Sequence, residues 1–195
     1  MKHRILCLLF LFALLGQAAF ARPITDRYDD TFRKYSKRFF SVAFDWRIFK
    51  AQGMAESNLD MNARSWVGAK GIMQLMPSTF QEIRSRHPEM KAINHPEWNI
   101  AAGIFYDWQL WTQWQVDAQA DDYNRFMLGS YNAGRGTLMR AQKVAVARAL
   151  DPSTWLSIRT IAPEVPSWRH QETLDYIERI EANLAQMDDH GHIMP

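Results

Sequence analysis

Helical periodicity is the sequence feature that most constrains the fold, because it runs through the chain from residue 28 to residue 187. Apolar residues recur three and four positions apart, as on one face of a helix, and no segment alternates convincingly as strands do. We predict helices over 28–40, 46–57, from 77 onward, and over 99–115, 121–133, 137–150 and 170–187. At most a small β-hairpin is expected near 65–72. The sequence therefore predicts a mainly α-helical domain.

Helix ends are marked by residues that favour capping. Asp45 is placed to cap the helix over 46–57, and Asp121 or Asp122 the helix that reaches about Ala133. Pro77 suits the first position of its helix, and Glu82 is placed to complete a capping arrangement there.

The first 21 residues have the pattern of a secretory signal peptide. Lys2 and Arg4 precede an apolar run over 5–15, and the segment 19–21 offers an A-x-A cleavage site. The alternative, an uncleaved anchor, is less favoured because the run is too short to span a bilayer comfortably. We therefore expect a mature chain that begins at Arg22 and lies in the periplasm or is secreted.

Removal of that segment changes what the composition implies. Cys7, the only cysteine, would be lost, so we expect neither a disulfide nor thiol chemistry. Cys7 also precedes most of the apolar run, so it is badly placed for lipid attachment, and no stable membrane anchor is expected. Without Lys2 and Arg4 the chain carries 21 basic and 21 acidic residues. This balance argues against nucleic acid or anionic lipid as a partner.

Aromatic residues are abundant, with 8 Trp, 11 Phe and 6 Tyr. They fit a large aromatic core, and they also fit a sugar-binding cleft in which rings stack on pyranose faces. Composition alone leaves both interpretations open.

The chain shows no internal repeat, low-complexity tract or clear linker, so we expect one domain. We divide it into an N-terminal helical extension over 22–44, a main domain over 45–187 and a loose polar tail over 188–195. His190 and His192 in that tail lack a matched carboxylate or cysteine at ligand spacing, so no metal or other cofactor is predicted. We expect a monomer.

Glu56 is the residue we favour as an acid catalyst. It ends the predicted helix over 46–57 and shares a face with Phe49, Gln52 and Gly53. A carboxyl group against aromatic surface is poorly solvated, which raises its pKa, as a general acid requires. Taken alone, however, a glutamate is more often an ordinary solvated side chain.

Five short segments give Glu56 a context. In order along the chain they are Glu56-Ser57, Gly68-Ala69-Lys70-Gly71-Ile72-Met73-Gln74, Asn99-Ile100-Ala101-Ala102-Gly103, Tyr131-Asn132-Ala133-Gly134 and Glu172-Thr173-Leu174-Asp175-Tyr176. Each is weak alone, but their order and spacing over about Asp45 to Tyr176 are specific. Taken together, they resemble the lysozyme-like lytic transglycosylases of the soluble, SLT type. The resemblance implies a goose-type-like lysozyme fold for the domain over 45–187.

The resemblance also implies a role for each matching residue. Glu56 corresponds to a single catalytic acid and base, and Ser65 to a serine that positions the N-acetyl group or the intermediate. The other implied substrate-binding residues are Gln74, Met76, Tyr131, Asn132 and Tyr176. Each also has a structural interpretation: Met76 as core, Asn132 as a helix cap and Tyr131 as a packing anchor.

The implied reaction cleaves peptidoglycan glycan strands between N-acetylmuramic acid and N-acetylglucosamine. Glu56 would protonate the glycosidic oxygen and then deprotonate the 6-hydroxyl, which closes a 1,6-anhydro ring. One rival is a hydrolytic muramidase with Asp60 as second carboxylate, although Asn58 and Asp60 both favour a turn. Another is a non-catalytic peptidoglycan-binding or assembly protein on the same fold. The sequence leaves open whether the chain serves wall turnover or a machine of the cell envelope.

Overall fold

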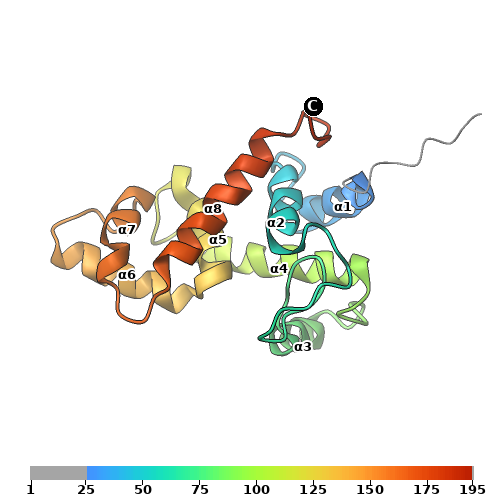
Figure 1. The fold of residues 1–195 in the computed structure, drawn as a ribbon, viewed down its shortest axis with the longest axis horizontal. Coiled ribbons are helices and arrows are strands. Elements are labelled where there is room, and N and C mark those ends of the chain that lie inside the picture. Colours follow the sequence, from blue (N-terminus) through green and yellow to red (C-terminus); the bar gives the residue numbers. More distant parts are fainter. Residues whose placement is uncertain (1–25, 195) are drawn as a thin grey trace, which may run out of the picture.

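The computed structural model describes residues 26–194, and the predicted signal peptide lies outside them. Eight α-helices follow one another within this part of the chain, and Figure 1 shows their arrangement. They are α1 (Asp29–Phe39), α2 (Arg47–Ser57), α3 (Pro77–Arg86), α4 (Pro96–Trp114), α5 (Tyr123–Ala133), α6 (Arg135–Ala147), α7 (Trp155–Ile161) and α8 (His170–Ala185). Short 3-10 turns, η2 (Ala120–Asp122) and η3 (Ala162–Glu164), precede α5 and follow α7. The predicted helical class is confirmed.

Helix α4 is the centre of the packing. It contacts α1, α3 and α5, while α2 packs against α8 and α1. In Figure 1, α1 to α3 lie on one side of the molecule and α5 to α7 on the other, with α8 crossing between them. This arrangement brings the end of α2 close to α5 and α8, although more than 65 residues separate them in sequence.

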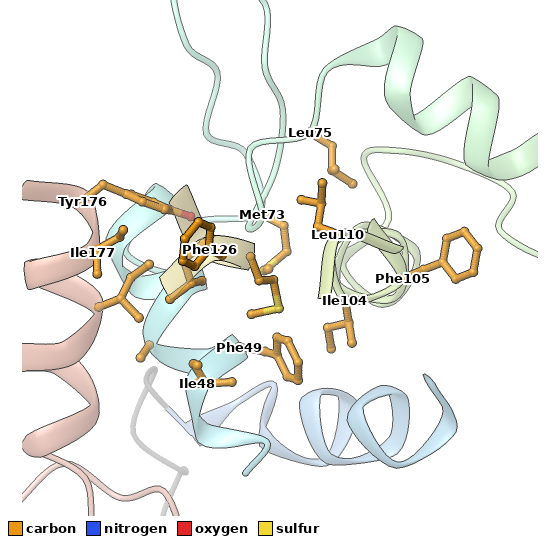
Figure 2. Packing of buried hydrophobic residues seen from close by; sticks show 14 of the residues in the cluster. Ile48, Phe49, Met73, Leu75, Ile104, Phe105, Leu110, Phe126, Tyr176 and Ile177 are labelled. Atoms are coloured by element: carbon orange, nitrogen blue, oxygen red, sulfur yellow. The ribbon is translucent and has the colours of Figure 1, made fainter. Parts of the chain in front are cut away.

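One hydrophobic core joins these helices, and it is strongly aromatic. Phe49, Met73 and Ile104 from α2, the following loop and α4 meet there, as Figure 2 shows. Most large rings within residues 26–194 are buried or partly buried, which favours the core interpretation of the aromatic composition. Trp66 is the clear exception, with 92% of its surface exposed.

The helix boundaries depart from the predicted ones where side chains act over long range. The Asp122 side chain makes no cap hydrogen bond to α5; its carboxylate accepts instead from the backbone N–H of Trp155, the first residue of α7, at 2.8 Å. Helix α7 itself was not predicted, because its seven residues are too few for a periodic pattern. Glu82 pairs with Arg86 instead of completing a cap. Asp45 lies one position before the N-cap residue of α2, Trp46, and its carboxylate accepts from the N–H of Arg47, the first residue of the helix, at 3.0 Å.

The segment near residues 65–72 is a compact loop in which Lys70 forms isolated bridges with Arg64 and Leu75. No extended strand forms within residues 26–194. None of the helices in the same range is long and apolar enough to cross a bilayer.

The prediction of a loose tail is wrong for residues 188–194, which fold back onto α2. The Lys50 ammonium donates to the carbonyl oxygen of Gly191 at 2.7 Å, and the Arg47 guanidinium donates to that of Asp188 at 2.9 Å. Gly191 lies against Trp46 so closely that a Cβ there would be 2.3 Å from the indole. The buried Lys50 ammonium and the tight turn at Gly191 therefore hold in place a polar segment that the sequence predicted to be loose.

Candidate active site

The loop over 58–76, which joins α2 to α3, forms one wall of the candidate site. Helix α2 ends at Asn58, whose left-handed conformation turns the chain sharply after Glu56. The Ser57 hydroxyl then donates to the carbonyl oxygen of Ile72 at 2.9 Å. This hydrogen bond joins the end of α2 to the loop.

Asn99 in the first turn of α4 fastens the same loop from a second side. Its side-chain oxygen accepts from the N–H of Met73 at 2.8 Å, and its amide nitrogen donates to the carbonyl oxygens of Lys70 and Ile93. Gly71 sits directly over this amide, where a Cβ would approach to 2.5 Å, and its φ is +75°. Glycine is therefore required at this position for space and for backbone conformation.

Tyr131 in α5 supplies a third attachment. Its hydroxyl donates to the carbonyl oxygen of Met73 at 2.8 Å. The loop backbone over 70–73 is thus held from α2, α4 and α5 together. The Asn-Ile-x-x-Gly and Tyr-Asn-Ala-Gly segments therefore both contact the same stretch of the loop, through Asn99 and Tyr131.

Glu56 lies half-buried at the end of α2, and its carboxylate accepts a hydrogen bond from the Tyr176 hydroxyl at 2.7 Å. Tyr176 comes from α8 and is almost fully buried. The structure therefore brings together two residues 120 positions apart.

Burial raises the pKa of Glu56 to about 7, although the hydrogen bond from Tyr176 and the positive charge of Arg179 both act to lower it. Arg179 lies one helical turn beyond Tyr176 on α8, and sequence reasoning did not single it out. A carboxyl group with a pKa near neutrality can donate a proton and then recover one, as general acid–base catalysis requires.

Sequence reasoning also missed a second carboxyl group close to Glu56. Asp107 in α4 is fully buried and accepts from the side-chain amide of Gln52 at 3.3 Å. Burial raises the pKa of Asp107 well above its ordinary value, and the nearby charge of Glu56 adds to that rise. Its position between tryptophans in an apolar helix gave no signal of contact with α2.

Asp60, the carboxylate that the sequence suggested as a partner for Glu56, is exposed and builds a turn. Its side chain accepts from the N–H of Asn62 at 2.8 Å. This agrees with the turn expected from Asn58 and Asp60.

The remaining predicted site residues lie around the loop and the end of α5. The Ser65 hydroxyl accepts from the N–H of Ala69 at 3.0 Å, and Gln74 donates its amide to the carbonyl oxygen of Gly71 at 2.9 Å. Gln74 has a φ of +43°, so the loop holds it in a conformation that few non-glycine residues adopt. Met76 is 40% exposed at the start of α3 and does not belong to the core.

Asn132 lies exposed at the end of α5 and is oriented by a short chain of hydrogen bonds. The Trp168 indole donates to the Thr173 hydroxyl at 3.0 Å, which donates to the side-chain oxygen of Asn132 at 2.8 Å. This fixes the amide so that its nitrogen is left to donate. Asn132, Trp168 and Arg169 line a polar hollow in the surface.

The residues described hold no cluster of three or more His, Cys, Asp or Glu side chains with metal-ligand geometry.

Known protein families and structures include relatives of this chain. The family model described as "Transglycosylase SLT domain" matches residues 33–152, which begin inside α1, earlier than the stretch we recognised, and end before α7. Among curated proteins, "Membrane-bound lytic murein transglycosylase F" of Desulfosudis oleivorans is 33% identical over 152 residues, 70% of this chain. The protein of the same name from Ectopseudomonas mendocina is 29% identical over 151 residues, 77% of this chain.

A solved structure has the same fold. The 70 kDa soluble lytic transglycosylase of Escherichia coli matches 81% of this chain with a TM-score of 0.61 and 24% identity. At that identity the likeness concerns the fold alone. The chain spans 30% of the length of the Ectopseudomonas relative, 32% of the Desulfosudis relative and 23% of the Escherichia coli protein.

Proposed function

Because this chain belongs to the transglycosylase SLT domain family, we propose that it is a peptidoglycan lytic transglycosylase in which Glu56 alone serves as acid and base. The observation that carries this proposal is the environment of Glu56. Its carboxyl group is half-buried, bonded to the Tyr176 hydroxyl at 2.7 Å, and has a pKa raised to about 7. A substantial fraction of Glu56 is therefore protonated at neutral pH and able to act as an acid.

In the first step, Glu56 transfers its proton to the glycosidic oxygen between N-acetylmuramic acid and N-acetylglucosamine. The bond from that oxygen to C1 of the muramic sugar breaks, and the acetamido oxygen of the same sugar stabilises C1. The Tyr176 hydroxyl steadies the carboxylate that has formed, because a hydrogen bond to a charged group is stronger than one between neutral groups.

In the second step, the Glu56 carboxylate takes the proton of the 6-hydroxyl, whose oxygen bonds to C1. The product carries a 1,6-anhydro ring, and Glu56 regains the proton with which it began. Intramolecular attack suits a site of this kind, because the nucleophile is part of the bound sugar and is already positioned. Neither water nor a metal ion takes part.

In this proposal the other predicted site residues bind the glycan strand or hold the loop beside it. The amide nitrogen of Asn132, free once its oxygen accepts from Thr173, donates to a sugar. Ser65 and Gln74 lie in the fastened loop, and Met76 offers an exposed apolar side chain at its end. Tyr131 acts by holding the loop through Met73.

The test is digestion of purified peptidoglycan followed by mass spectrometry of the products. We expect 1,6-anhydromuramoyl ends from the unaltered protein and their loss, by a factor of about 100 or more, in Glu56→Gln. Asp60→Asn is the matched control, because it also replaces a carboxylate by an amide but on the exposed turn; it should retain activity.

The outcomes separate the rival functions. Reducing ends in place of anhydro ends would make the protein a hydrolase and contradict the proposed second step. Binding of peptidoglycan without any cleavage would make it a binding or assembly protein. Undiminished cleavage by Glu56→Gln would exclude Glu56 as the acid.

The export of the chain is part of the same proposal. The segment over 1–21 has the signal-peptide pattern, and peptidoglycan lies outside the cytoplasmic membrane. N-terminal sequencing of the protein recovered from the periplasm or medium should begin at Arg22, and recovery of Met1 would contradict cleavage.

A further inference from the structure

Gln52 and Asp107 form a buried polar pair one helical turn before Glu56. Both side chains are fully buried, and the Gln52 amide nitrogen donates to Oδ1 of Asp107 at 3.3 Å. The other oxygen of each group, Oε1 of Gln52 and Oδ2 of Asp107, is also buried and has no hydrogen-bond partner within residues 26–194. The two unpartnered atoms thus belong to the two residues that already share one hydrogen bond.

Two unpartnered acceptors at one place require an explanation, because each buried polar atom without a partner costs stability. Two acceptors cannot satisfy each other unless one of them carries a proton. An amide cannot gain one near neutral pH, but a carboxyl group can, and it then has one O–H donor and one acceptor. A protonated carboxyl and an amide are complementary and can form two hydrogen bonds side by side.

The surroundings of Asp107 favour the neutral form. The titratable group that acts on Asp107 is Glu56 on α2, and the charge of Asp107 acts in turn on Tyr106 on α4, Tyr131 on α5 and Tyr176 on α8. None of these supplies a positive charge. A buried carboxylate without a cation is strongly disfavoured, and such a group takes up a proton instead.

We propose that Asp107 carries a proton at neutral pH and forms a cyclic acid–amide pair with Gln52, in which Oδ2–H of Asp107 donates to Oε1 of Gln52. This pair locks the middle of α2 to α4 and leaves no charge behind Glu56. Its role in positioning Glu56 rests on the proposed function, whereas its protonation does not.

Asp107→Asn tests the protonation, because asparagine can form the same two hydrogen bonds without titrating. A carboxyl group whose pKa is higher in the folded than in the unfolded protein binds more protons when folded. Its contribution to stability is therefore lost as pH rises above the ordinary pKa of aspartate. Relative to Asp107→Asn, the unfolding equilibrium constant of the unaltered protein should rise about tenfold per pH unit from about pH 4.5 until the raised pKa is reached.

The measurement is urea unfolding of both proteins at a series of pH values. Glu56 is present in both proteins, so its own titration cancels in the ratio. Asp60→Asn is the matched control for the same substitution at an exposed site. A ratio that does not change with pH, or an Asp107→Asn protein that is less stable throughout or does not fold, would overturn the proposal.

A second measurement needs no variant to fold. In the unaltered protein, with its aspartate carboxyl carbons labelled with carbon-13, one buried carboxyl should keep the chemical shift of the protonated form at about pH 7. Titration of every aspartate signal below about pH 5 would likewise overturn the proposal.

The positioning role has its own readouts. Asp107→Leu leaves the Gln52 amide buried without its partner, so kcat should fall about tenfold with little change in KM, and Asp107→Asn should recover most of that loss. The upper pH limit of activity should stay in place in Asp107→Asn, because no charge behind Glu56 is removed. A shift of that limit to lower pH would mean that Asp107 is ionised. If the stability results are as expected but Asp107→Leu has unaltered kinetics, Asp107 is protonated and the positioning role is contradicted.

Discussion

The two halves of α2 hold buried polar side chains in opposite ways. In the first half, the fully buried Lys50 meets Asp26 at 3.1 Å, Asp29 at 2.8 Å and the carbonyl oxygen of Gly191 at 2.7 Å. In the second half, the Glu56 carboxylate accepts from the Tyr176 hydroxyl, and Asp107 of α4, close behind it, accepts from the Gln52 amide; within residues 26–194 neither carboxyl group has a directly bonded cation. Helix α2 therefore carries a cation balanced by opposite charges in its first half and a carboxyl group without a directly bonded cation at its end.

The difference shows how the same burial can serve stability or chemistry. A buried charge surrounded by opposite charges keeps its ionised form and ties distant segments together. A buried carboxyl without an adjacent cation is driven toward its protonated form, which an acid catalyst needs. The following predictions test that contrast, from the largest expected effect to the smallest.

Lys50→Met should lower the free energy of unfolding by about 3–5 kcal/mol, because it removes the buried cation that Asp26 and Asp29 both contact. Chemical denaturation at about pH 7 measures the loss. Lys34→Met is the control, since its pair with Glu97 at 2.7 Å is at the surface and should contribute under about 1 kcal/mol. Equal losses in the two variants would show that the buried Lys50 stabilises the fold no more than a surface lysine does, and would contradict the contrast between the halves of α2.

Glu56→Gln should stabilise the protein by about 3 kcal/mol at pH 8 and have almost no effect near pH 4. The folded pKa of Glu56 is about 7, above its ordinary value of 4.5. The folded state therefore holds the proton more tightly, and stability is lost as pH rises through that window. Thermal or urea unfolding at both pH values checks this, and a gain of equal size at both would contradict it.

Tyr176→Phe should move the upper pH limit of activity upward by about one pH unit, because the hydrogen bond that stabilises the Glu56 carboxylate is lost. The pH dependence of kcat/KM measures this limit. Tyr123→Phe removes another tyrosine hydroxyl, one bonded to the carbonyl oxygen of Gln115 at 3.2 Å, and should leave the limit in place. A downward shift in Tyr176→Phe would reverse the assigned effect of the hydrogen bond.

Arg179→Gln should shift the same limit upward by only a few tenths of a pH unit, since Arg179 is exposed and lowers the pKa of Glu56 through space. Salt screens such an interaction, so the shift should disappear at about 1 M salt. Activity profiles at low and high salt measure it. A shift as large as that of Tyr176→Phe, or one that survives in salt, would show that the arginine acts by direct contact.

The sequence predicted the features that depend on local pattern. The helical class, the helix that carries Glu56 near its end, the bond from Asp45 to its first turn and the turn at Asp60 could all be inferred from residues close to one another. The last helix ends at Ala185, a few residues before the predicted end, and the Asp122 side chain does not bond to α5 as expected. Such local signals carry no information on which distant segment a side chain meets.

The features that escaped prediction depend on contacts between distant segments. Asp107 meets Gln52 55 positions away, and Lys50 meets the carbonyl oxygen of Gly191 141 positions away. An aspartate within an apolar helix and a lysine in the middle of another look unremarkable until the helices pack. The resemblance supplied Tyr176, but only folding places its hydroxyl on Glu56.

The loop that follows α2 has a fastened base and an outward rim. Its backbone at residues 70–73 forms hydrogen bonds with the side chains of Ser57, Asn99 and Tyr131. By contrast, Trp66 and Val67 project outward, with 92% and 51% of their surfaces exposed. Substitutions at the rim can therefore accumulate, by drift or by design, without loosening the wall beside Glu56. A library of variants at Trp66 and Val67 would change the contacts of the outer edge of the loop and preserve the chemistry at Glu56.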